Sequence, residues 1–106
     1  MTVPTIDVTE LAGLPPGSVV IDVREPDEYV EGHVPGARLI PLGEIVERVE
    51  EVPTDTTVYL ICQMGGRSAK AAGYLLTQGV DAVNVAGGTG AWVAAGEPVV
   101  TGEAAG

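Results

Sequence analysis

The sequence predicts one α/β domain built on a mainly parallel, five-stranded sheet, and three observations lead to this prediction. The 106 residues match the length of a single domain with one core, so we assign residues 1–106 to one domain. Short apolar, β-rich runs alternate along the chain with segments of helical character, as they do in α/β domains. Apolar residues make up 45% of the chain but include no Phe, so the core must consist mainly of Val, Leu, Ile and Ala.

Five runs are typical of strands, and they cover residues 5–7, 18–23, 38–40, 57–62 and 82–85. The fourth run, "TVYLIC", is apolar on both faces apart from the hydroxyl of Tyr59. Such a strand is buried on both sides, so we expect it in the middle of the sheet.

The segments between these runs carry helix signals. Thr9 is placed to cap a short helix in "ELAGL", and Pro26 stands in the first turn of "EPDEYVEG", which Gly32 ends. In "LGEIVERVEEV", residues 42–52, four apolar side chains fall on one helical stripe that should cover the sheet: Leu42, Ile45, Val46 and Val49.

A further helix is predicted from Ser68 onward. In "SAKAAGYLLTQG" apolar residues recur at helical spacing, and Gly79 is expected to end the helix as a left-handed cap. The tail "TGEAAG", residues 101–106, has the small polar character of a frayed end.

The net charge of the chain excludes some classes of binding partner. Fifteen acidic and five basic residues give a formal net charge of −10, which repels nucleic acid and anionic membrane surfaces, so we predict neither as a partner. No apolar run approaches the roughly 20 residues that cross a bilayer, and the first residues lack the basic and apolar regions of a signal peptide. We therefore expect a cytoplasmic protein.

The single cysteine excludes an intrachain disulfide and a multi-thiolate metal site, so no metal is predicted.

The position of that cysteine suggests that its thiol is a catalytic nucleophile. A lone cysteine on an apolar strand is most often a small hydrophobe, but Cys62 ends the strongest strand, where open α/β sheets bind ligands. The turn that follows, "QMGGR", contains two glycines, so its backbone N–H groups can curl around one point as an anion-binding nest at the start of the next helix. A thiol facing such a nest is stabilised as the nucleophilic thiolate.

Two basic residues flank this turn. Arg67 lies inside it, and we interpret its guanidinium as a donor to an anion, whereas Lys70 is interpreted as an exposed helix residue. Ser68 either caps the helix or donates its hydroxyl to the sulfur, and we favour capping.

Three stretches of the chain resemble the single-domain rhodaneses of the sulfurtransferase family. They are "VIDVREPDEYVEGHVPGA" at 20–37, "VYLICQMGGRSAKAAGYL" at 58–75 and "VNVAGGTGAWVAAGEPV" at 83–99, and together they cover nearly the whole chain. The resemblance implies a three-layer α/β/α fold with strand order 3-2-4-5-1 and the catalytic Cys62 at the end of strand four.

The resemblance also implies a two-step reaction. Cys62 would take the outer sulfur of thiosulfate or another sulfane donor, hold it as a persulfide, and pass it to cyanide in the laboratory or to a thiol in the cell. A protein sulfur acceptor is also open, and no metal or organic cofactor is implied. The donor and the persulfide would be held by the turn after the cysteine: Gln63, Met64, Gly65, Gly66, Arg67 and Ser68.

Other polar residues are assigned supporting roles. His33, the only histidine, lies in "GHVPGA", which resembles a structural turn of the family, so we expect it to brace a loop and not to pair with Cys62. Asp22 and Arg24 either touch substrate or form a charged bracket at the active-site end of the sheet, and we favour the bracket. Trp92 is expected to anchor the core under the C-terminal helix.

Rival functions remain open from the sequence. Rhodaneses that use thiosulfate often have two basic residues in this turn, whereas "CQMGGRS" has only Arg67, so a less charged persulfide or polysulfide is an alternative donor. A tyrosine or dual-specificity phosphatase uses five residues between its cysteine and arginine, and here there are four. A non-catalytic module that binds a partner protein, or a persulfide carrier, has no sequence feature here that separates it from the enzyme.

Overall fold

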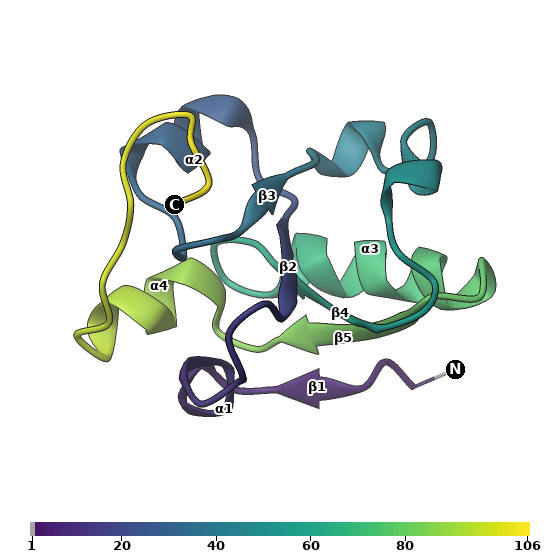
Figure 1. Cartoon of the computed structure of the whole chain (residues 1–106), viewed down its shortest axis with the longest axis horizontal. Coiled ribbons are helices and arrows are strands. Elements are labelled where there is room, and N and C mark those ends of the chain that lie inside the picture. The colour runs from purple at the N-terminus through teal and green to yellow at the C-terminus, as the bar shows by residue number, and fades with distance from the viewer. Residues whose placement is uncertain (1) are drawn as a thin grey trace.

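The protein is built on a five-stranded, wholly parallel sheet (Figure 1). A computed structural model describes residues 2–106. The strand order is β1-β5-β4-β2-β3, which confirms the order that the family resemblance implied and places β4 in the middle. The strands are β1 (Thr5–Ile6), β2 (Val19–Asp22), β3 (Arg38–Leu39), β4 (Thr57–Ile61) and β5 (Asp81–Val85).

Helices cover both faces of the sheet, so the predicted three-layer arrangement is confirmed. One core contains Leu60 of β4 and Leu75 of the long helix, and the other contains Ile61 of β4 and Trp92. Successive residues of β4 thus enter opposite cores, as the period of a strand requires. The helices are α1 (Val8–Ala12), α2 (Pro26–Glu31), α3 (Gly66–Thr77) and α4 (Gly88–Ala94), with two 3₁₀ turns, η1 (Leu42–Glu44) and η2 (Val49–Glu51).

The first helix begins earlier than predicted. Asp7, and not Thr9, is its N-cap, because the Asp7 carboxylate accepts a 2.9 Å hydrogen bond from the Glu10 backbone N–H. Thr9 therefore lies within α1. A side chain can satisfy the free N–H groups of a first turn only from the position just before it, and Asp7 occupies that position.

The helix predicted over residues 42–52 is wrong, because the segment forms η1 and η2 joined by turns. Tight turns of three residues align positions i and i+3, so Leu42 and Ile45 share one side. Ile45 is 2% exposed, whereas Val46, which we had placed on the same stripe, is 58% exposed.

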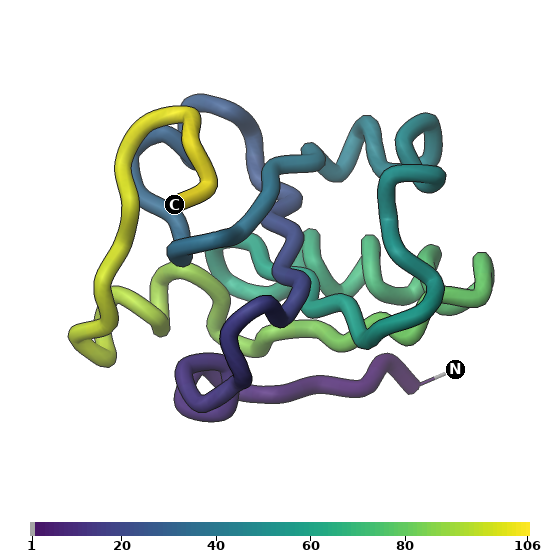
Figure 2. Tube along the Cα trace, in the orientation of Figure 1, coloured from purple at the N-terminus to yellow at the C-terminus, as the bar shows by residue number. Residues whose placement is uncertain are grey.

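The C-terminal tail, for which we expected a frayed end, instead makes hydrogen bonds to the chain around α2. Gly102 N–H donates to Val30 O over 2.8 Å, and Gly36 N–H donates to Ala105 O over 2.7 Å. Figure 2 shows the tail running alongside α2. None of the helices in residues 2–106 has the length and apolar run that crossing a bilayer requires.

The corrected conformation of residues 42–52 has a direct test. Ile45→Ala removes a buried side chain and should lower the free energy of unfolding by about 2 to 5 kcal/mol, whereas Val46→Ala should change it by no more than about 0.5 kcal/mol. Urea denaturation of both variants measures this difference. Equal losses would indicate that both side chains are buried, as a continuous helix requires.

Candidate functional site

The site is the turn that joins β4 to α3. Cys62 directly follows β4 and is only 1% exposed. Gly65 has a φ of +112°, which lies in the region that favours glycine, and it is the N-cap of α3. Because Gly65 permits this sharp reversal, α3 begins at Gly66, two residues before the predicted start at Ser68, and its first turn faces the cysteine.

Hydrogen bonds converge on the sulfur of Cys62. Gly65 N–H donates to Cys62 Sγ over 3.0 Å, and the Ser68 hydroxyl donates to it over 3.3 Å. Burial raises the pKa of the Cys62 thiol, but hydrogen bonds from the Ser68 hydroxyl and from the backbone N–H groups of Ser68, Gly65 and Met64 outweigh it, so the pKa lies below its ordinary value. The turn therefore favours a thiolate.

Ser68 does not have the helix-capping role that we favoured from the sequence. It lies inside α3, so our expectation that it caps the helix is wrong. Its buried hydroxyl lies 3.3 Å from Cys62 Sγ and 2.6 Å from Asn84 Oδ1, and because it carries one hydrogen it donates to only one of these acceptors at a time. We missed Asn84, although a polar residue inside the apolar strand "AVNV" is a signal for it.

The start of α4 holds the turn from outside. Thr89 N–H donates to Cys62 O over 2.8 Å, and Gly90 N–H donates to Gln63 O over 3.0 Å. These bonds require close approach at Gly88, whose φ is +58°. A β-carbon there would overlap Cys62 O and lie 2.7 Å from Gln63 O, so only glycine fits.

A buried ion pair supports the turn from the side of β2. Arg24 Nη2 lies 2.9 Å from Asp22 Oδ2, and the two side chains are 3% and 0% exposed. Arg24 Nη1 also donates to Gln63 Oε1 over 3.1 Å. The bracket that we expected is thus present, and it contacts the turn through the Gln63 side chain.

Arg67 is bound by a carboxylate that we did not anticipate. Its Nη1 and Nη2 donate to the two carboxylate oxygens of Glu28 in α2, over 2.6 and 2.9 Å. Glu28 lies 39 residues away in the sequence, and no local pattern announces this contact. We expected the Arg67 guanidinium to bind an incoming anion, but the Glu28 carboxylate already binds it.

The ring of His33 makes its hydrogen bonds away from the sulfur of Cys62. His33 is buried and stacked on Tyr29, and its Nδ1 and Nε2 each lie 2.8 Å from a carbonyl oxygen, those of Tyr29 and Ala104. It braces the loop after α2, as expected. Met64 is 78% exposed and Gly66 is exposed at the surface of the turn. Binding of a donor by Gln63–Ser68 stays a prediction.

A shallow hollow of about 510 Å³ opens beside the turn. Its lining contains two carboxylates, one guanidinium, and polar and apolar residues: Arg24, Glu28, Glu31, Gly32, Gln63, Thr89, Val93 and Val99. Gln63, the residue after Cys62, is the part of the active-site turn that lines this hollow, and we refer to the hollow as the entrance.

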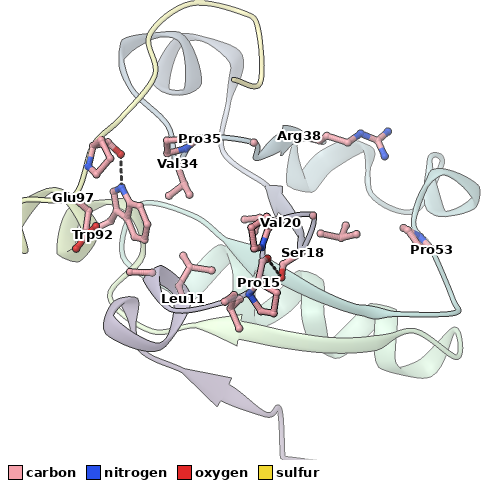
Figure 3. A pocket seen from close by; sticks show the side chains of 17 residues that line it. Leu11, Pro15, Ser18, Val20, Val34, Pro35, Arg38, Pro53, Trp92 and Glu97 are labelled. Atoms are coloured by element: carbon pink, nitrogen blue, oxygen red, sulfur yellow. Dashed lines mark hydrogen bonds between the residues drawn. The ribbon is translucent and has the colours of Figure 1, made fainter.

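A separate hollow of about 620 Å³ lies at the amino end of β2, on the side of α1 and α4 (Figure 3). Leu11 and Trp92 point into it, and Trp92 Nε1 donates to Pro98 O over 2.7 Å. Trp92 is 6% exposed and packs in the core as we expected. Since the Cys62 turn lies at the carboxyl ends of the strands, we assign this hollow no part in its chemistry.

Comparisons with known proteins agree with this geometry. A model of the rhodanese-like domain matches residues 7–95. The uncharacterized protein YqhL of Bacillus subtilis is 46% identical over 74 residues, which are 69% of this chain and 59% of YqhL. A sulfurtransferase of Allochromatium vinosum is 38% identical over 86 residues, 80% of each chain. The crystal structure of a rhodanese-related protein from Thermoplasma volcanium has a TM-score of 0.87 at 34% identity, covering 92% of this chain and 97% of that one.

The contact between α4 and the turn generates a prediction. Gly88→Ala forces a β-carbon against Cys62 O and should cost about 2 kcal/mol or more in the free energy of unfolding. Gly96→Ala is the matched control, because Gly96 has a similar φ of +79° but no atom within 4 Å of its β-carbon position. Its cost should be about 1 kcal/mol, from the left-handed backbone alone. If chemical denaturation gave equal costs, the close approach would be refuted.

Proposed function

Because the chain belongs to the rhodanese-like domain family, we propose that it is a sulfurtransferase that carries sulfur as a persulfide on Cys62. The single observation that supports this assignment most is the pair of hydrogen bonds from Gly65 N–H and the Ser68 hydroxyl to Cys62 Sγ. A thiolate stabilised in this way at neutral pH is the nucleophile that the transfer needs.

The first step is an attack by the Cys62 thiolate on the outer sulfur of a sulfane donor. The sulfur–sulfur bond of the donor breaks, and its electron pair leaves with the inner group, which is sulfite from thiosulfate or a thiolate from a persulfide. The outer sulfur is now bonded to Cys62. We expect backbone N–H groups of the turn to hold negative charge on it, since Gly65 N–H already donates to the neighbouring Cys62 Sγ.

The second step returns the enzyme to its starting state. An acceptor thiolate attacks the outer sulfur of the persulfide, and Cys62 leaves as a thiolate in the same set of hydrogen bonds. The turn therefore stabilises the nucleophile of the first step and the leaving group of the second. Both steps move electron pairs only between sulfur atoms. Neither step therefore needs an oxidant, a reductant or a group that the chain does not supply. A thiol or a protein thiol is the proposed acceptor in the cell.

A phosphatase fits the site less well. A phosphatase places its loop arginine on the phosphate, whereas the Arg67 guanidinium is bonded through both Nη atoms to Glu28. Four residues separate Cys62 from Arg67, so the ring of N–H groups is also smaller than the phosphatase loop. A carrier module that only holds the persulfide uses the same first step and is the alternative within the family.

Mass spectrometry tests the proposed first step. Intact protein incubated with thiosulfate or with the hydropersulfide of 2-mercaptoethanol should gain one sulfur atom, and cyanide should remove it. Cys62→Ser should gain none, because a hydroxyl is a poor nucleophile at neutral pH. Circular dichroism serves as the control that this variant is folded. If neither donor added sulfur to the wild-type protein, a binding module would replace the enzyme as the better account.

A further inference from the structure

The Glu28 carboxylate is fixed in position by the helix that carries it. Its Oε1 accepts the Glu25 backbone N–H over 3.1 Å, so Glu28 closes a capping box at the start of α2. The same carboxylate receives two hydrogen bonds from Arg67. Planar pairs of this kind hold both partners in a defined geometry. Glu28 thus restrains the one guanidinium that the active-site turn supplies.

The charge of Glu28 persists across the pH range in which sulfur transfer is measured. The hydrogen bond from Arg67, with smaller contributions from the Glu25 N–H and the charges of Arg67 and Arg24, lowers the pKa of Glu28 to about 2, and burial opposes this shift only in part. The guanidinium of Arg67 has a raised pKa, chiefly through the same hydrogen bond. The pair is therefore fully ionised at neutral pH.

Among the residues that line the hollow, Arg24 is the only cation. Arg24 is buried, and its guanidinium is engaged by Asp22, Gln63 and Gly32. Glu28 and Glu31 add carboxylates to the lining of the hollow, and Val93 and Val99 add exposed apolar surface. Near the turn there are thus three carboxylates, those of Asp22, Glu28 and Glu31. They outnumber the two guanidinium groups of Arg24 and Arg67, so a dianion approaches a region of net negative charge.

We propose that Glu28 is a specificity-determining residue that, by holding Arg67, disfavours dianionic thiosulfate and favours an organic hydropersulfide as the sulfur donor. This inference rests on the proposed function of Cys62. In the favoured step, the Cys62 thiolate attacks the outer sulfur of R–S–SH. The sulfur–sulfur bond breaks, the SH group becomes bonded to Cys62, and R–S⁻ leaves with the electron pair and takes a proton from water.

Glu28→Gln isolates the charge of Glu28. Glutamine keeps the shape of the side chain and an oxygen for the Glu25 N–H, but it no longer neutralises Arg67. The measurement is the second-order rate constant for persulfide formation on Cys62, with thiosulfate and with the hydropersulfide of 2-mercaptoethanol. The ratio of the thiosulfate constant to the hydropersulfide constant should rise about tenfold or more, the effect of one charge-assisted hydrogen bond.

Two further variants show whether the effect acts through Arg67. Glu31→Gln removes an equal charge from the same hollow, but Glu31 does not pair with Arg67, so the ratio should stay within about threefold of wild type. Adding Arg67→Gln to Glu28→Gln should abolish the gain. Arg67→Gln alone leaves Glu28 uncompensated and should lower the ratio, which keeps the test available if Glu28→Gln does not fold.

The outcomes separate this inference from the function on which it rests. An unchanged ratio in folded Glu28→Gln, or an equal rise in Glu31→Gln, overturns the role of Glu28 while persulfide formation stands. A gain that survives Arg67→Gln also overturns it. Absence of a persulfide in the wild-type protein with both donors overturns the function itself.

Discussion

Two hydrogen bonds from the start of α4 fix the geometry on which the rest of the site depends. Thr89 N–H and Gly90 N–H bind the carbonyl oxygens of Cys62 and Gln63, so these carbonyls are directed toward α4. The following N–H groups are then free to face the sulfur, and Gly65 N–H does so at 3.0 Å. Since this arrangement needs a glycine at position 88, the glycines after β5 matter as much to the cysteine as those in its own turn.

Charge near the cysteine is arranged in pairs, and this shapes what the site can bind. In a chain of net charge −10, the two arginines nearest to the turn are both engaged by carboxylates, Arg24 by Asp22 and Arg67 by Glu28. The buried pair stiffens the end of β2 and orients Gln63, whereas the pair at the entrance is partly exposed. Hydrogen bonds from backbone N–H groups and the Ser68 hydroxyl lower the pKa of the thiol, and we propose that the charges of the arginines and their carboxylates act on the donor.

Local patterns predicted the parts of the fold that local forces determine. The five strands, the central place of β4 and the position of Cys62 follow from apolar runs and glycine turns, and the strand ends agree within two residues. Residues 42–52 failed because a helical stripe and two tight turns bury nearly the same side chains, and only packing decides that Val46 is exposed. Glu28 and Asn84 meet the site from other elements, so their roles depend on tertiary contacts that sequence spacing does not encode.

The central claim is that the turn stabilises Cys62 as a thiolate, and the ultraviolet absorbance of the thiolate measures this directly. Titration of the wild-type protein, with Cys62→Ser subtracted to remove tyrosine, follows the only thiol in the chain. Because the folded state lowers the pKa of Cys62, the thiolate should be lost only as the pH falls through a midpoint below the free-thiol value of about 8.5. A midpoint at or above about 8.5 would contradict the account.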